Sequence, residues 1–125
     1  KGANIRDWIY VDDHCNGVLT AFLKGKSGES YNISKNNEIN NITIVKKILE
    51  LMDKSEDLIE FVEDRPGHDF RYSMSSEKIS KELGWKPKVN FEKGIQDTIK
   101  WYLDHEDYWK DTPSSIFNPT PWKNK

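Results

Sequence analysis

The sequence has one cysteine, few apolar side chains and no excess of charge of either sign. Cys15 alone cannot form a disulfide within the chain, and no apolar run approaches the ~20 residues that a membrane-spanning helix needs. The 19 basic and 21 acidic residues nearly cancel, which excludes the basic surface that recruits nucleic acid or anionic lipid. No signal-peptide pattern is present. We therefore expect a cytoplasmic protein with no nucleic-acid or membrane partner.

Aromatic residues, in contrast, are plentiful: 5 Trp, 5 Tyr and 5 Phe in 125 residues. They argue against disorder, even though the apolar fraction of 35% lies below the ~45–50% of ordinary soluble domains. A chain of this length makes one domain and can bury roughly two-thirds of its unfolded surface without a disulfide or zinc. It is short for a complete two-lobed enzyme that uses a cofactor.

Three short strands are expected. Apolar and polar residues alternate over 5–11 (IRDWIYV), which is the period of a strand. Two more strands are expected at about 30–33 and at 58–62 (LIEFV), and the polar stretch 34–40 (SKNNEIN) is expected to be a loop. Because strands alternate with helices, the sequence predicts an α/β fold with at least some parallel pairing.

Four helices are expected from apolar residues at helical spacing and from residues that begin and end helices. The expected limits are Asp12 or Asp13 to Gly25, a second helix capped by Asn41, Ser75 or Ser76 to Gly84, and a last helix from Asn90 or Phe91. The tail after residue 104 contains three prolines and is expected to be irregular.

Two strings resemble catalytic or metal motifs without the geometry that these need. Tyr31 and Lys35 have the spacing of a dehydrogenase Tyr-x-x-x-Lys pair, but here a strand is expected to run into a loop, so the two side chains need not lie together. Residues 12–15 (DDHC) are neighbours that point in different directions along a helix, so caps and a core thiol at Cys15 explain them better than a metal site. We expect no catalytic residue and no metal ligand in this chain.

A turn at 66–67 (Pro-Gly) is flanked by Arg65 and His68. A guanidinium and an imidazole that converge on one place suit a diphosphate, because arginine donates two parallel hydrogen bonds to phosphate oxygens. The alternative is an ordinary surface turn in which Asp64 and Asp69 pair with the arginine.

Arg6 lies in the middle of an otherwise apolar strand pattern. A charge that is half-buried there needs a partner. Asp7 or Asp12 could be that partner, or an anionic ligand could be.

These strings together carry a family pattern. RDWIYVDDH, followed by YNIS, DRPGHDFRY and KELGWKP, resembles the C-terminal part of dTDP-glucose 4,6-dehydratases, nucleotide-sugar enzymes of the extended short-chain dehydrogenase/reductase superfamily. The resemblance covers about residues 1–101. It implies that 1–105 form the C-terminal substrate-binding lobe plus late strands and helices of an extended short-chain dehydrogenase Rossmann fold, with 106–125 as an irregular tail.

The resemblance implies a substrate-binding role for four residues: Arg6, Asn41, Arg65 and His68. The two arginines would contact the nucleotide diphosphate, and the histidine would lie beside it. For Asn41 the neighbouring asparagines of NNEINN are alternatives, and capping of the second helix is its structural role in either case.

The activity that the resemblance implies is conversion of dTDP-glucose to dTDP-4-keto-6-deoxyglucose through an internal NAD redox cycle, in a homodimer. The sequence has no GxxGxxG, so the N-terminal part that binds NAD would be missing and the chain alone would be inactive. Two alternatives stay open: a fragment of a UDP-sugar epimerase or decarboxylase, which shares the RDWIYVDD type of string, and a non-catalytic nucleotide-sugar-binding module.

Overall fold

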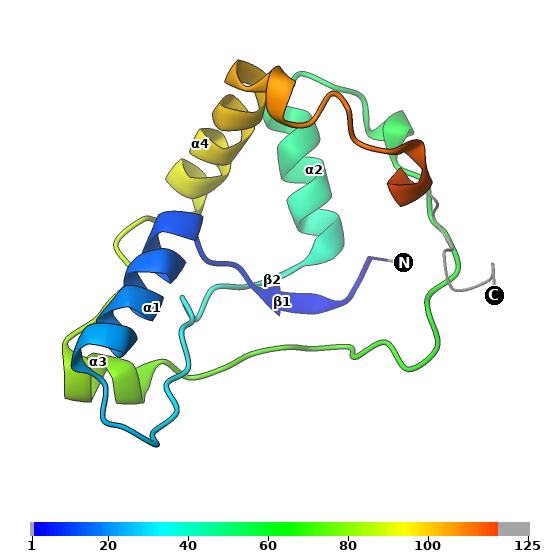
Figure 1. Cartoon of the computed structure of the whole chain (residues 1–125). Helices are drawn as coiled ribbons and strands as arrows, with labels where there is room; N and C mark the ends of the chain where they lie inside the picture. Colours follow the sequence, from blue (N-terminus) through cyan, green and yellow to red (C-terminus); the bar gives the residue numbers. More distant parts are fainter. Residues whose placement is uncertain (1, 118–125) are drawn as a thin grey trace.

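Two short strands lie at the centre of the structure, a computed structural model that describes residues 2–117 (Figure 1). β1 (Ile5–Asp7) pairs antiparallel with β2 (Glu38–Asn40), so that Arg6 lies opposite Ile39. On its other edge Ile5 forms a parallel bridge with Arg71: the Ile5 N–H donates to the Phe70 carbonyl (2.8 Å), and the Tyr72 N–H donates to the Ile5 carbonyl (3.0 Å). This bridge brings the loop after residue 63 back to Arg6.

The predicted strands are largely wrong in their positions. The first ends at Asp7 instead of residue 11, and neither 30–33 nor 58–62 is a strand. The second strand lies instead at 38–40, inside the stretch expected to be a loop. The two named strands are antiparallel, and within the part of the chain that the structure describes, parallel pairing is limited to the Ile5–Arg71 bridge. A strand needs a hydrogen-bonded neighbour, and a period of two along the sequence does not supply one.

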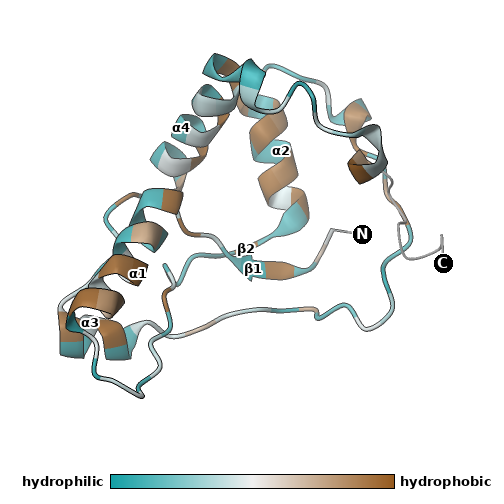
Figure 2. Ribbon diagram, in the orientation of Figure 1, coloured by the Kyte–Doolittle hydropathy of each residue, from teal (hydrophilic) through white to brown (hydrophobic). Residues whose placement is uncertain are grey.

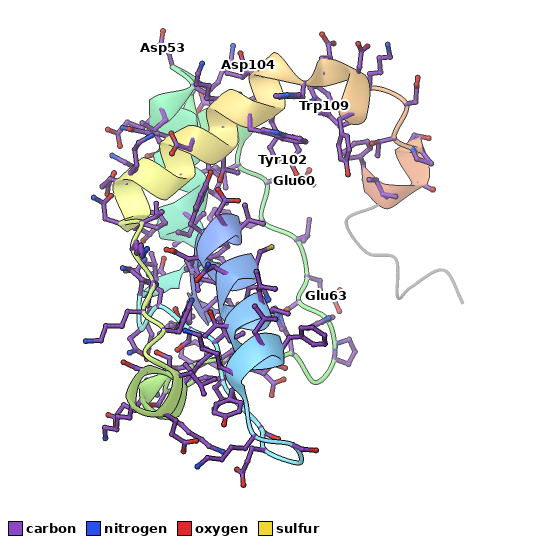
Figure 3. The ribbon with its side chains drawn as sticks, turned by 60° about the vertical axis from the view of Figure 1, so that its left-hand side comes forward. Asp53, Glu60, Glu63, Tyr102, Asp104 and Trp109 are labelled. Atoms are coloured by element: carbon purple, nitrogen blue, oxygen red, sulfur yellow. The ribbon has the colours of Figure 1, made fainter. Side chains whose placement is uncertain are left out.

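Residues 2–117 form four α-helices: α1 (Val11–Lys24), α2 (Asn41–Leu51), α3 (Glu77–Leu83) and α4 (Phe91–Asp104). α1 packs against α3, and α2 packs beside α4 (Figure 1). Short 3-10 turns lie at Glu56–Leu58 (η1), Glu106–Tyr108 (η2) and Ser114–Phe117 (η3), the last two within the part of the tail expected to be irregular. After α4 the chain folds back, because the Trp109 indole N–H donates to the Tyr102 carbonyl at 2.9 Å (Figure 3).

The helix limits are close to those predicted, and two of the expected caps are confirmed. The Asn90 side chain accepts from the Lys93 N–H (2.8 Å) at the start of α4. Gly84 ends α3 in the left-handed region, with φ +73°, which glycine adopts without strain.

Two other predicted caps are wrong. α2 is capped by Asn40, whose side chain accepts from the Thr43 N–H (2.9 Å), and Asn41 is the first residue inside the helix. α1 begins after Tyr10, so Asp12 and Asp13 lie inside its first turn. The buried Asp13 carboxylate instead accepts the backbone N–H groups of Lys88 (2.9 Å) and Val89 (2.8 Å), and so ties α1 to the segment before α4.

The core is small: Ile44 of α2 is buried, and another part lies where α1, α3 and the segment after α3 meet. Ile79 and Trp85 are buried there, and a Cβ at Gly17 of α1 would come within 3.0 Å of the Trp85 ring. The opposite face of α1 is open: Phe22 is 83% exposed, and Val18, Leu19 and Leu23 are each exposed by half or more. Figure 2 shows the hydrophobic colour along this helix. Cys15, expected in the core, is exposed because no described segment covers this face.

Within residues 2–117, no helix is both long enough and apolar enough to cross a membrane.

Candidate functional site

The site is built around Arg6, which β1 places at the edge bridged by residues 70–72. Its Nη1 donates to the Ile5 carbonyl (2.6 Å), and its Nη2 donates to the Asp69 carbonyl (3.0 Å) and contacts the His68 Nε2 (2.8 Å). The guanidinium also lies over the Tyr72 ring, 4.6 Å from its centroid. These partners are neutral groups. In the described part of the chain, no carboxylate forms an ion pair or hydrogen bond with this half-buried cation.

Neither carboxylate considered as a partner for Arg6 takes that place. The Asp7 side chain accepts three consecutive backbone N–H groups, those of residues 35, 36 and 37, at 3.0–3.3 Å. Asp12 is exposed on the first turn of α1. Neighbouring residues of a strand point to opposite faces, so Arg6 turns toward the 64–72 loop and Asp7 toward the 35–37 loop.

The loop 64–69 presents a second group of side chains to Arg6. Asp64 Oδ1 lies 2.6 Å from His68 Nδ1, and this hydrogen bond holds the pKa of Asp64 below its usual value. The hydroxyl of Tyr72 donates to the Asp69 carboxylate, and this contact raises the pKa of Tyr72. Gly67 turns the chain with φ +67°, and a Cβ there would meet open space.

The alternative in which Asp64 and Asp69 pair with the Arg65 side chain is not what the structure shows. Asp64 accepts the backbone N–H of Arg65 (2.9 Å), but its side-chain partner is His68. Asp69 is engaged by Tyr72. The Arg65 side chain stays exposed in the same loop, close enough for its charge to oppose the rise in the pKa of Tyr72.

Of the four residues predicted to bind substrate, Arg6 and His68 are in direct contact in the structure. Arg65 lies in the 64–69 loop, three positions before His68, and does not share this contact. Asn41 is linked to the group through its backbone: its N–H donates to the Asn4 carbonyl (3.0 Å), and the Asn4 side chain donates to the Asp69 carbonyl (3.3 Å). Asn4 and Tyr72 were not predicted. Both depend on the Ile5–Arg71 bridge, which nothing in the local sequence indicates.

A cavity of about 690 Å³ lies elsewhere, between α2 and α4, and contains none of these four residues. Its lining is mostly apolar, with Ile48, Phe91, Ile95 and Trp101 among it, and it includes no Lys or Arg. It offers no cation to an anionic ligand. The cluster at Arg6 is the better candidate because it combines an arginine that pairs with no carboxylate among the described residues with an exposed glycine turn.

No group of three or more potential metal ligands occurs in residues 2–117.

Tyr31 does not pair with Lys35. Its hydroxyl donates to Glu82 (3.1 Å) on α3 and accepts the Lys26 N–H (3.3 Å). This contact fastens the loop after α1 to α3, which is a structural role.

Comparison with known proteins agrees with the sequence pattern. Over residues 1–98 the chain matches the family described as GDP-mannose 4,6 dehydratase. It is 44% identical over 124 residues to a dTDP-glucose 4,6-dehydratase of Escherichia coli, which covers 94% of this chain and 34% of that protein. The crystal structure of the Bacillus anthracis dTDP-glucose 4,6-dehydratase in complex with NAD has a TM-score of 0.82 at 44% identity, over 88% of this chain and 35% of that one. The Streptomyces venezuelae enzyme, also with NAD bound, has a TM-score of 0.84 at 36% identity, over 88% and 34%.

The chain therefore spans about a third of the length of the curated relatives that it matches. The resemblance to dTDP-glucose 4,6-dehydratases is confirmed, and so is the α/β fold class, since the structural neighbours are dehydratases of that kind. With a family match over residues 1–98, the chain belongs to the GDP-mannose 4,6-dehydratase family.

Proposed function

We propose that this chain is the nucleotide-diphosphate-binding part of a dTDP-glucose 4,6-dehydratase, the enzyme that converts dTDP-glucose to dTDP-4-keto-6-deoxyglucose. Residues 1–105 would form the binding part, and the remaining two thirds of the relatives' length would supply the rest. The names of the relatives support this assignment, because dTDP-glucose 4,6-dehydratases recur among both curated proteins and solved structures.

The observation that carries the proposal is the state of Arg6. Its guanidinium is half-buried and bonded only to carbonyls and an imidazole, so its charge has no carboxylate partner within the described residues. A cation taken out of water in this way favours an anion. A diphosphate would supply that charge, and each charge-assisted hydrogen bond to it would contribute ~1.5–3 kcal/mol.

Three further residues complete the proposed binding group. Arg65 is exposed in the 64–69 loop and free to reach a ligand over the open Gly67 turn. His68 lies beside Arg6, and Asn41 stands at the start of α2 with its backbone linked to the cluster through Asn4. Their role would be to bind and orient the nucleotide, so that binding energy far from the reacting sugar carbons positions the sugar.

The residues of this chain do not fit NAD. A dinucleotide site needs a glycine-rich turn between a strand and a helix, and the sequence has no GxxGxxG. We therefore derive no redox step from these residues. In our proposal the complete protein binds NAD mainly through its other part, works in the cytoplasm and forms a homodimer, and this chain alone has no turnover.

The surface of the chain supports packing against another part of the protein. Its accessible surface is 9573 Å², whereas a folded monomer of 14.7 kDa would expose about 6,900 Å². Part of the excess is the apolar face of α1, where Phe22 and Leu23 are largely exposed. A free-standing binding module would not need such a face, so this observation favours the fragment over the non-catalytic module.

The test is calorimetric titration of the chain with dTDP, with UDP as the comparison that addresses the epimerase alternative. We expect dTDP to bind, and Arg6→Ala and Arg65→Ala each to weaken binding by about tenfold, the equivalent of ~1.4 kcal/mol. Lys100→Ala is the matched control, because it removes one positive charge from α4, where Lys100 pairs with Asp104 and not with the residues around Arg6.

An affinity for dTDP that neither arginine substitution changes would exclude the proposed diphosphate site. Tighter binding of UDP than of dTDP would favour a UDP-sugar enzyme instead.

A further inference from the structure

The contacts of His68 determine which of its nitrogens carries the proton. A guanidinium has only N–H donors, so the 2.8 Å contact between Arg6 Nη2 and His68 Nε2 is a hydrogen bond only if Nε2 holds a lone pair. The proton of the neutral ring is then on Nδ1. That nitrogen lies 2.6 Å from Asp64 Oδ1, an acceptor. Two independent contacts therefore agree on one tautomer.

The remaining neighbours are consistent with this assignment. The side chain of Asn4 lies 3.5 Å from His68 Nδ1, but its amide N–H donates to the Asp69 carbonyl at 3.3 Å. Asp69 itself is occupied by the Tyr72 hydroxyl. Asp64 is thus the carboxylate that engages the imidazole, and the hydrogen bond lowers the pKa of Asp64 and keeps it ionised as an acceptor.

We propose that Asp64 is a positioning residue that fixes His68 as the Nδ1–H tautomer, and that His68 in turn holds the Arg6 guanidinium through Nε2. The arrangement is a relay of three side chains: a carboxylate accepts from an imidazole, which accepts from a guanidinium. The opposite tautomer would place an Nε2–H against the Arg6 N–H, donor against donor, and release the guanidinium from this side.

This relay assigns His68 a role different from direct ligand binding. In the Nδ1–H tautomer the Nε2 atom cannot donate to a phosphate oxygen, so the imidazole would act by orienting Arg6. The expected consequence for affinity rests on the proposed diphosphate site, whereas the tautomer itself does not depend on any ligand.

The experiment combines nitrogen NMR of the histidines with dTDP titration. The chain has three histidines, and the signals of His68 are identified by their loss in His68→Asn. In alkaline buffer the wild-type His68 should show Nδ1 protonated and Nε2 bare. In Asp64→Ala the Nε2–H form should appear, and the Kd for dTDP should rise about fivefold, as for the loss of one hydrogen bond.

Two variants separate positioning from charge. Asp64→Asn keeps an oxygen that accepts the same proton, so it should retain the Nδ1–H tautomer and most of the affinity. Glu60→Gln removes one negative charge from the preceding, exposed stretch of the same segment and should change neither (Figure 3).

An Nε2–H tautomer in the wild type, or an unchanged tautomer in Asp64→Ala, would overturn the inference. So would an Asp64→Asn variant as impaired as Asp64→Ala, because the carboxylate would then act through its charge. If the tautomers behave as expected but the wild type fails to bind dTDP, the proposed function fails and the positioning role of Asp64 stands.

Discussion

Substitution of Gly17, in the middle of α1, by alanine adds one methyl group, which has two opposing effects on the free energy of unfolding. Replacing a helical glycine by alanine stabilises an exposed helix by ~1 kcal/mol, because the unfolded chain loses freedom. At Gly17, however, the added Cβ would lie 2.8 Å from Ile33 Cγ2 and 3.0 Å from Trp85 Cε2. Trp85 is 4% exposed, so its ring has little room to move.

Overpacking of this kind costs ~1–3 kcal/mol, which exceeds the gain in helix propensity. We therefore expect Gly17→Ala to lower the free energy of unfolding by about 1 kcal/mol. The measurement is urea unfolding followed by tryptophan fluorescence and by circular dichroism, since Trp85 lies at the contact.

Gly94 of α4 supplies the matched control. It is also a buried helical glycine, but a Cβ there would meet Tyr10 and Val89 at 3.3–3.5 Å, distances that need only a slight adjustment. Gly94→Ala should thus be neutral or stabilising by up to ~1 kcal/mol. If Gly17→Ala proves as stable as Gly94→Ala, the close packing of α1 on Trp85 is not a constraint and the reasoning is refuted.

Two further predictions concern the start of α2 and the strand beside it. Asn40→Ala should destabilise the chain by ~1 kcal/mol through loss of the cap on Thr43, whereas Asn41→Ala should leave that cap intact; thermal unfolding distinguishes the two. Hydrogen bonds from Arg71, and then from Ser73, lower the pKa of Glu38 to about 2. Since the folded-state pKa is depressed, the stabilisation is present above the ordinary value of about 4.5 and is lost as the pH falls toward 2. Glu38→Gln should therefore be less stable than wild type at pH 7, with a difference that shrinks over this acidic range; a pH-independent difference would contradict it.

Local signals in the sequence account for the helices. The cap at Asn90 and the left-handed turn at Gly84 depend on residues within a few positions of the helix ends, so both could be predicted from the sequence. The cap of α2 was misplaced by one residue, because Asn40 and Asn41 are both suitable and only the backbone path decides between them. Strand β2 could not be predicted, since Glu38–Asn40 has no strand pattern and is ordered by pairing with Ile5–Asp7, more than 30 positions earlier in the chain.

In the candidate site, too, local residue patterns could be predicted and long-range contacts could not. Residue types and the family pattern pointed to Arg6 and His68, and the structure brings them together. The partners that hold them are long-range: the Tyr72 ring reaches Arg6 only because residues 70–72 lie against β1. The pairing of Asp64 with His68, rather than with Arg65, depends on the curvature of the turn at Gly67, which the sequence does not determine.

The opposite facing of Arg6 and Asp7 has a consequence for β1 itself. A strand of three residues has few ladder hydrogen bonds with which to fix its alignment against its neighbours. A slip by one position would turn the Asp7 carboxylate toward the carbonyl oxygens of residues 69 and 70, which now accept from Arg6, and would turn the Arg6 guanidinium toward the three N–H groups of residues 35–37. Both encounters set like partial charges against each other. The adjacent arginine and aspartate thus favour a single alignment of β1, so the pair that separates the Arg6 contacts from the 35–37 loop also protects the strand from misregistration.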